Sequence, residues 1–125
     1  MLRSLRGRVR QYAVSNGTVA AQTKKLARSG LDQVFDAVFL SEELGAEKPS
    51  PAFFGQVFER IGEPDRRRVL IVGDSLTGDM RGGADAGIAT CWYNPHGLPA
   101  PDPAELRIDY TICDLHEVPG LVLGR

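Results

Sequence analysis

Residues 68–79 constrain the fold more than any other part of this 125-residue chain. Four consecutive apolar residues, 69–72, run directly into Gly73 and Asp74. An apolar run without polar alternation predicts a strand covered on both faces, as in the parallel sheet of an α/β protein. Asp79 follows at a position where a helix could begin. Both carboxylates are therefore predicted at the carboxyl end of an inner strand, where open α/β sheets hold their ligands.

Strand-like and helix-like segments alternate along the rest of the chain. The clearest helix is 51–61, where apolar side chains recur three and four positions apart and a proline stands in the first turn. This alternation predicts a three-layer, Rossmann-like α/β fold with a mostly parallel sheet and right-handed connections. The predicted strands are 9–14, 37–40, 69–72, 88–93 and 109–113, and the predicted helices are 19–29, 51–61, 79–86 and a short one after Asp114 that Pro119 limits.

Size and composition favour one domain over residues 1–125, without a linker or second domain. The net charge of −1 argues against electrostatic capture of nucleic acid polymers or membranes. No apolar run approaches the roughly 20 residues of a membrane span. Cys91 and Cys113 lie in strand-like segments and are interpreted as buried, reduced thiols of a cytoplasmic protein.

Two further polar groups each follow a predicted strand. Ser15, Asn16 and Gly17 offer a hydroxyl, an amide and backbone N–H groups, which suit an anion. The alternative is an ordinary turn with Thr18 as helix cap, and alone it is the better interpretation. Lys48 supplies a compact positive charge suited to a phosphoryl oxygen. Its alternative is a solvent-facing lysine before a helix, which again is favoured when the residue is considered alone.

The pair Asp74 and Asp79 carries the strongest functional signal. Hard carboxylate oxygens suit Mg²⁺, which can bridge to a phosphate. The alternative is a helix-capping aspartate beside a turn aspartate. The metal interpretation is favoured, because a buried strand seldom ends in two nearby carboxylates without a counter-charge.

In this order and context, the three clusters resemble the motifs of the haloacid dehalogenase-like (HAD) superfamily of phosphohydrolases. Ser15 resembles the second motif, Lys48 the third, and Gly73-Asp74-Ser75 with Asp79 the fourth. Segments 41–49 and 86–94 resemble the branch that includes bacterial pyrimidine 5′-nucleotidases.

The resemblance implies a Mg²⁺-dependent phosphoric monoester hydrolase acting on a small phosphorylated metabolite or nucleotide. It assigns the transferring phosphoryl group to Ser15 and Lys48, further phosphate contacts to Asn16 and Gly17, and the metal to Asp74 and Asp79, with Asp74 the direct ligand. Trp92, Tyr93 and His96 could border the site, although core packing for Trp92 and a surface loop for His96 are favoured.

One departure from the family concerns the nucleophile. The family carries it in an Asp-x-Asp motif on a central first strand, and no Asp-x-Asp occurs in this sequence. The helical cap domain is missing as well, so the chain resembles the C-terminal part of such an enzyme and is expected to be inactive alone.

The absent strand would leave two inner strands without their shared neighbour. These strands could close up, accept a strand from a partner or a second copy of the chain, or make the chain poorly soluble. The alternative function is a non-catalytic module that binds phosphate or Mg²⁺ or assembles with another chain. A dinucleotide-binding domain is disfavoured, because no Gly-x-Gly-x-x-Gly opens a helix after the first strand.

Overall fold

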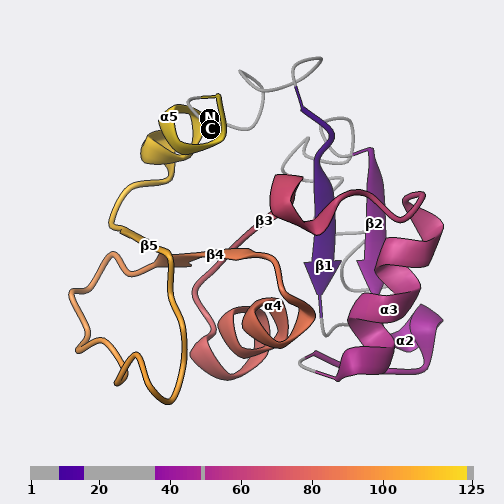
Figure 1. Ribbon diagram of the computed structural model, residues 1–125, viewed down its shortest axis with the longest axis horizontal. Coiled ribbons are helices and arrows are strands. Elements are labelled where there is room, and N and C mark those ends of the chain that lie inside the picture. Colours follow the sequence, from indigo (N-terminus) through magenta and orange to yellow (C-terminus); the bar gives the residue numbers. More distant parts are fainter. Residues whose placement is uncertain (1–8, 16–35, 49, 124–125) are drawn as a thin grey trace.

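The strands form two parallel sheets in the computed structural model, which describes residues 9–15, 36–48 and 50–123. β1 (Tyr12–Ser15) pairs with β2 (Ala37–Leu40). β3 (Leu70–Gly73), β4 (Ala89–Tyr93) and β5 (Tyr110–Ile112) form the second sheet in that order (Figure 1). The predicted α/β class and parallel pairing are confirmed. Within the described residues no ladder joins β1 to β3, so these two strands have not closed up.

Most helices lie where the apolar spacing predicts them. The predicted helix at 19–29 lies outside the described residues. Among the helices that the structure describes, none has the length and apolar character of a membrane span. The helices are α2 (Ser41–Leu44), α3 (Pro51–Arg60), α4 (Arg81–Ala86) and α5 (Val118–Leu123), with short turns η3 (Arg66–Arg68), η4 (Leu76–Met80) and η5 (Leu115–Glu117).

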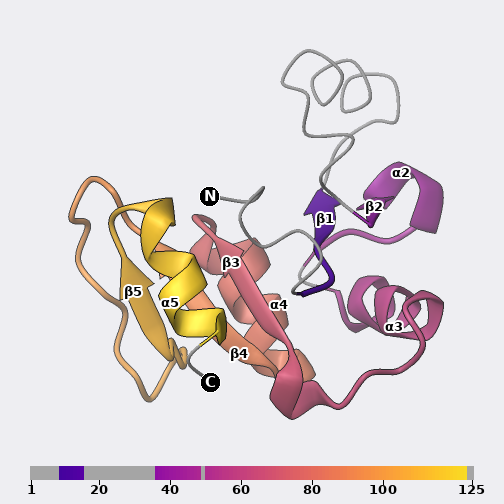
Figure 2. The same ribbon diagram turned by 90° about the horizontal axis from the view of Figure 1, so that it is seen from above.

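The sheet β3-β4-β5 lies between α4 and α5 (Figure 2). Side chains alternate across a strand, so one face of this sheet carries Ile71 and Trp92 and the other carries Cys91 and Ile112. The first set belongs to the main core with α3, and the second packs with Val118 of α5. The predicted coverage of β3 on both faces is therefore confirmed.

Two glycines allow α4 to approach its neighbours closely. A Cβ at Gly82 would collide with the ring of Phe54 on α3, and one at Gly83 would collide with Ile71 on β3. The helix ends at Gly87, which adopts the left-handed conformation with φ 77°. Because α4 packs so closely, the turn at 76–80 between β3 and α4 lies against the sheet.

Three details differ from the sequence predictions. Asp79 does not begin a helix, because residues 76–80 form a π-helical turn and α4 begins at Arg81. Pro119 does not limit the final helix but lies in the first turn of α5, where a missing N–H is tolerated. Cys91 is buried as predicted, and burial raises its pKa to about 11, with a smaller contribution from Glu117. Cys113 is exposed, because β5 ends one residue before it.

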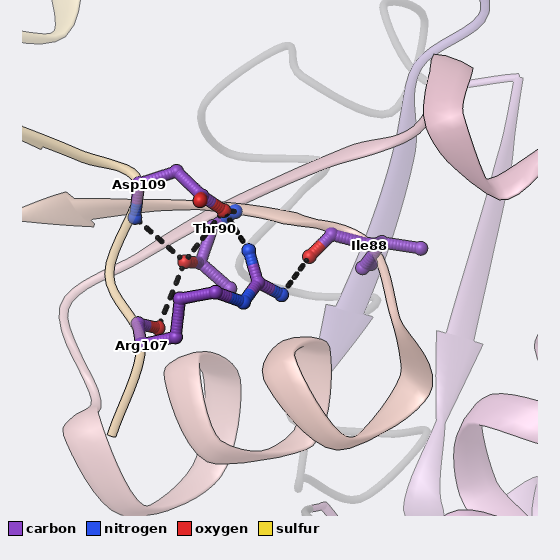
Figure 3. Close-up of polar contacts among 4 residues, drawn as sticks. All are labelled: Ile88, Thr90, Arg107 and Asp109. Atoms are coloured by element: carbon purple, nitrogen blue, oxygen red, sulfur yellow. Dashed lines mark hydrogen bonds and ion pairs between the residues drawn. The ribbon is translucent and has the colours of Figure 1, made fainter. Parts of the chain in front are cut away.

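A polar cluster attaches the segment before β5 to the start of β4 (Figure 3). The Thr90 N–H donates to Asp109 Oδ2 at 2.9 Å, and the Thr90 hydroxyl donates to the Arg107 carbonyl at 3.2 Å. The Arg107 guanidinium forms an ion pair with Asp109 and donates to the Ile88 carbonyl at 2.8 Å. Burial alone would raise the pKa of Asp109, but the hydrogen bond from Thr90 and the Arg107 guanidinium outweigh it, and the pKa is lowered.

We predict that Gly82→Ala lowers the free energy of unfolding by about 1–3 kcal/mol, because the added methyl group overpacks the contact with Phe54. The matched control is Gly55→Ala on α3, where the methyl group meets nothing within 4 Å. This control should raise stability by about 0.5–1 kcal/mol, as expected for glycine replacement within a helix. Urea unfolding measures both. Equal effects of the two substitutions would contradict the proposed close packing of α4.

We predict that Asp109→Asn destabilises the protein at pH 7 by about 1 kcal/mol, because it weakens the ion pair with Arg107 and the hydrogen bonds from Thr90 at a site that is partly screened by solvent. The folded-state pKa of Asp109 is lowered, so its contribution is present above the unfolded pKa of about 3.9 and is lost as pH falls through the folded value. The difference from wild type should therefore shrink toward pH 2. Thermal unfolding across pH measures it, and a difference that is constant with pH would contradict this account.

Candidate functional site

Lys48 lies between the two sheets at their carboxyl ends. Its Nζ donates to the Val14 carbonyl of β1 at 3.3 Å and forms an ion pair with Asp79 Oδ1. The side chains of Lys48 and Asp79 are only 10% and 11% exposed. One ammonium group thus joins the end of β1 to the turn after β3. Lys48 is not the solvent-facing lysine that the sequence alone favoured.

The position of Asp79 depends on the glycine that ends β3. A Cβ at Gly73 would collide with the Asp79 carboxylate, so only glycine permits this close approach. The turn between them is shaped by Ser75, whose Oγ accepts a hydrogen bond from the Gly78 N–H at 2.9 Å. The sequence alone left open that an aspartate caps the helix after β3. The structure gives this capping role to Ser75.

Asp74 differs from Asp79 in exposure and in contacts. It lies one residue past β3 and is exposed. Its backbone carbonyl accepts a hydrogen bond from Trp92 Nε1 at 3.2 Å, and Trp92 is 1% exposed in the core. Among the described residues its carboxylate makes no hydrogen bond or ion pair. The backbone of Asp74 is thus held by a rigid buried ring, while its carboxylate remains available to a ligand.

The other predicted site residues are placed only in part. Ser15 is the last residue of β1, directly after Val14, so its backbone lies at the same end of the sheet as Lys48. Asn16 and Gly17 lie outside the described residues. His96 is in an exposed loop after β4, and Tyr93 is partly buried.

The donor set fits a magnesium ion only in part. No group of three His, Cys, Asp or Glu side chains gathers as a metal site in the described ranges. Mg²⁺ is commonly held by one or two carboxylates together with water and substrate phosphate, so three protein ligands are not required. Asp74 fits this requirement as it stands, whereas Asp79 is engaged by Lys48.

Sequence reasoning missed two contacts that shape this site. The ion pair joins residues 31 positions apart, and no local spacing signals it. The Trp92 contact with Asp74 spans 18 positions. Its one available signal was that the chain contains a single tryptophan, on the strand following the motif.

A family model for haloacid dehalogenase-like hydrolases matches residues 1–87. The chain belongs to this family. The *Escherichia coli* pyrimidine 5′-nucleotidase YjjG is 39% identical over 122 residues, which cover 98% of this chain and 53% of that protein. The *Streptococcus pneumoniae* pyrimidine 5′-nucleotidase PynA is 47% identical over 87 residues, covering 70% of this chain and 37% of PynA. The predicted resemblance to the nucleotidase branch is confirmed.

A solved structure supports the same HAD-hydrolase family. The HAD-hydrolase YfnB from *Bacillus subtilis*, described as bound to magnesium, superposes with a TM-score of 0.92 at 39% identity. The match covers 97% of this chain and 52% of YfnB. The chain therefore spans about half the length of such relatives, in agreement with the predicted incomplete core.

We predict strong coupling between Lys48 and Asp79 in a double-mutant cycle. Lys48→Met and Asp79→Asn should each destabilise the protein by about 3–5 kcal/mol, since each alters one partner of a buried ion pair. The double variant should lose clearly less than the sum, because no unpaired charge remains. Urea unfolding of the four proteins measures the coupling. Additive losses would show that the pair does not act as a unit.

Proposed function

We propose that this chain is the phosphate- and Mg²⁺-binding part of a HAD-type phosphoric monoester hydrolase. The observation that carries the proposal is the buried Lys48 ammonium, fixed at the carboxyl ends of two parallel strands. An exposed Asp74 carboxylate, held through its backbone, follows one of these strands. A positive charge and a hard oxygen ligand at this edge are the groups that phosphoryl transfer requires.

Each residue has a distinct role in this proposal. Lys48 binds a phosphoryl oxygen and offsets its negative charge, and Asp79 keeps the lysine in position. Asp74 is the direct metal ligand, and Asp79 is a second metal ligand only if its carboxylate binds the ion and Lys48 at the same time. Ser15 contacts the phosphoryl group, and Asn16 and Gly17 add phosphate contacts. When bound, the metal ion supplies further charge stabilisation to the phosphate.

Catalysis by this chain alone is not expected, because the sequence holds no Asp-x-Asp motif to supply a nucleophile. The substrate class proposed is a small phosphorylated metabolite, specifically a nucleotide, in the cytoplasm. The names of YjjG and PynA support the nucleotide. One hydrophobic cluster includes side chains from both sheets, such as Phe39 and Ile71, which supports a single domain over residues 1–125.

A second candidate function is assembly with another chain. It is favoured by the edges of β1 and β3 that pair with no other strand within the described residues. The Gln11 carbonyl points toward the β2 side, so alternation turns the Tyr12 and Val14 backbone groups to the opposite edge, where the Val14 carbonyl accepts a hydrogen bond from Lys48. The Val69 carbonyl points toward β4, so the Leu70 and Val72 backbone groups face the other edge of β3, where the described residues form no ladder. Such edges can accept a strand from a second copy of the chain. A concentration-dependent dimer in light scattering would favour this candidate, and a strict monomer would exclude self-assembly.

The metal site can be tested with the chain's only tryptophan as reporter. Because Trp92 Nε1 binds the Asp74 carbonyl, Mg²⁺ at the Asp74 carboxylate should change the tryptophan fluorescence in a saturable way. Asp74→Asn should weaken Mg²⁺ binding at least tenfold. Asp85→Asn, an exposed carboxylate on α4, is the matched control and should leave binding unchanged. A titration without saturation, or equal losses in both variants, would contradict the proposed metal ligand.

A further inference from the structure

An open polar hollow lies at the opposite end of the sheet from Lys48. It has a volume of about 380 Å³ and lies where β3, β4 and β5 begin. Its charged lining consists of Arg66, Arg67, Arg107 and Asp109. Strands of this length separate it from the carboxyl edge by roughly 15 Å, so it is distinct from the candidate phosphatase site.

The guanidinium groups of Arg66 and Arg107 both donate to backbone carbonyls at the end of α4. Arg66 Nη1 donates to the Ala86 carbonyl at 2.6 Å, and Arg107 Nη2 donates to the Ile88 carbonyl at 2.8 Å (Figure 3 shows the second). Only Gly87 lies between the two residues whose carbonyls accept these hydrogen bonds. Arg66 is held further by stacking over the Phe58 ring, 4.7 Å from its centroid. Both groups are therefore ordered before any ligand arrives.

The charge of the hollow is positive. Three arginines line it against the single carboxylate of Asp109, which already pairs with Arg107. Arg67 pairs with Asp65, so one positive charge remains even when that carboxylate is counted. A guanidinium carries five N–H donors, and Arg66 uses one of them on Ala86. Fixed guanidinium groups with remaining donors match the planar, bidentate recognition of phosphate oxygens.

We propose that this hollow binds a small polyanion with at least two phosphate groups, the chemistry of inorganic pyrophosphate or the phosphate end of a nucleoside diphosphate. Linked phosphates can contact Arg66, Arg67 and Arg107 together, whereas a single phosphate can contact fewer of these groups. The site binds a ligand remote from the reacting phosphoryl group. The competing explanation is that the arginines only stabilise the end of α4 through its carbonyls.

The test is a titration of the folded chain with inorganic pyrophosphate at 150 mM salt, followed by amide resonances in two-dimensional NMR. Saturable shifts are expected at Gly87, Ala89 and Tyr110, and not at residues 74–79 of the other anion site. Titration with a nucleoside diphosphate separates the two ligand sources. Tighter binding than pyrophosphate assigns the site to a nucleotide, and equal or weaker binding assigns it to the inorganic anion.

Arginine variants separate a ligand site from a structural cap. Arg66→Gln should weaken pyrophosphate binding about tenfold, and Arg67→Gln should weaken it about threefold to tenfold. The Arg67 side chain is 90% exposed, so its variant remains folded and informative if Arg66→Gln unfolds. The matched control is Arg68→Gln, the same charge change one residue along and outside the lining, with a loss below twofold. Equal losses in all three variants, or shifts confined to residues 74–79, would overturn the proposal.

Discussion

The ion pair between Lys48 and Asp79 is the interaction on which the site depends. No hydrogen-bonded ladder joins β1 to β3 within the described residues, and the lysine spans their carboxyl ends by binding Val14 and Asp79. A buried ion pair adds little net stability, because desolvation offsets the attraction between the charges. Its main effect is therefore positional. It fixes one positive charge where a phosphoryl group could be bound.

The surrounding residues keep that charge in place through a series of close approaches. Gly73 allows the Asp79 carboxylate to lie against the end of β3, and Gly82 and Gly83 allow α4 to pack on α3 and the sheet. Trp92 fixes the backbone of Asp74 from the neighbouring strand. A larger residue at Gly73 would collide with the Asp79 carboxylate itself, whereas one at Gly82 or Gly83 would disturb the packing of α4 on α3 and β3. The geometry of the site therefore depends directly on how closely these elements pack.

Local patterns predicted the elements but not the contacts between them. The unbroken apolar run at 69–72 predicted a strand covered on both faces, and the helical spacing in 51–61 predicted the buried face of α3. The Lys48–Asp79 contact could not be predicted, because it depends on tertiary packing across 31 positions. Exposure of Cys113 followed from a strand ending one residue early, an uncertainty that propensity does not resolve. The family resemblance supplied roles for the residues that spacing alone left ambiguous.

We propose that this chain carries the binding groups of a phosphatase site without its nucleophile. Hydrolysis of p-nitrophenyl phosphate by the purified, folded chain, with and without Mg²⁺ and beside Asp74→Asn, tests this claim most directly. The account predicts no turnover above the buffer rate under any of these conditions. Mg²⁺-dependent turnover that Asp74→Asn abolishes would contradict it, because a nucleophile would then have to exist within these 125 residues.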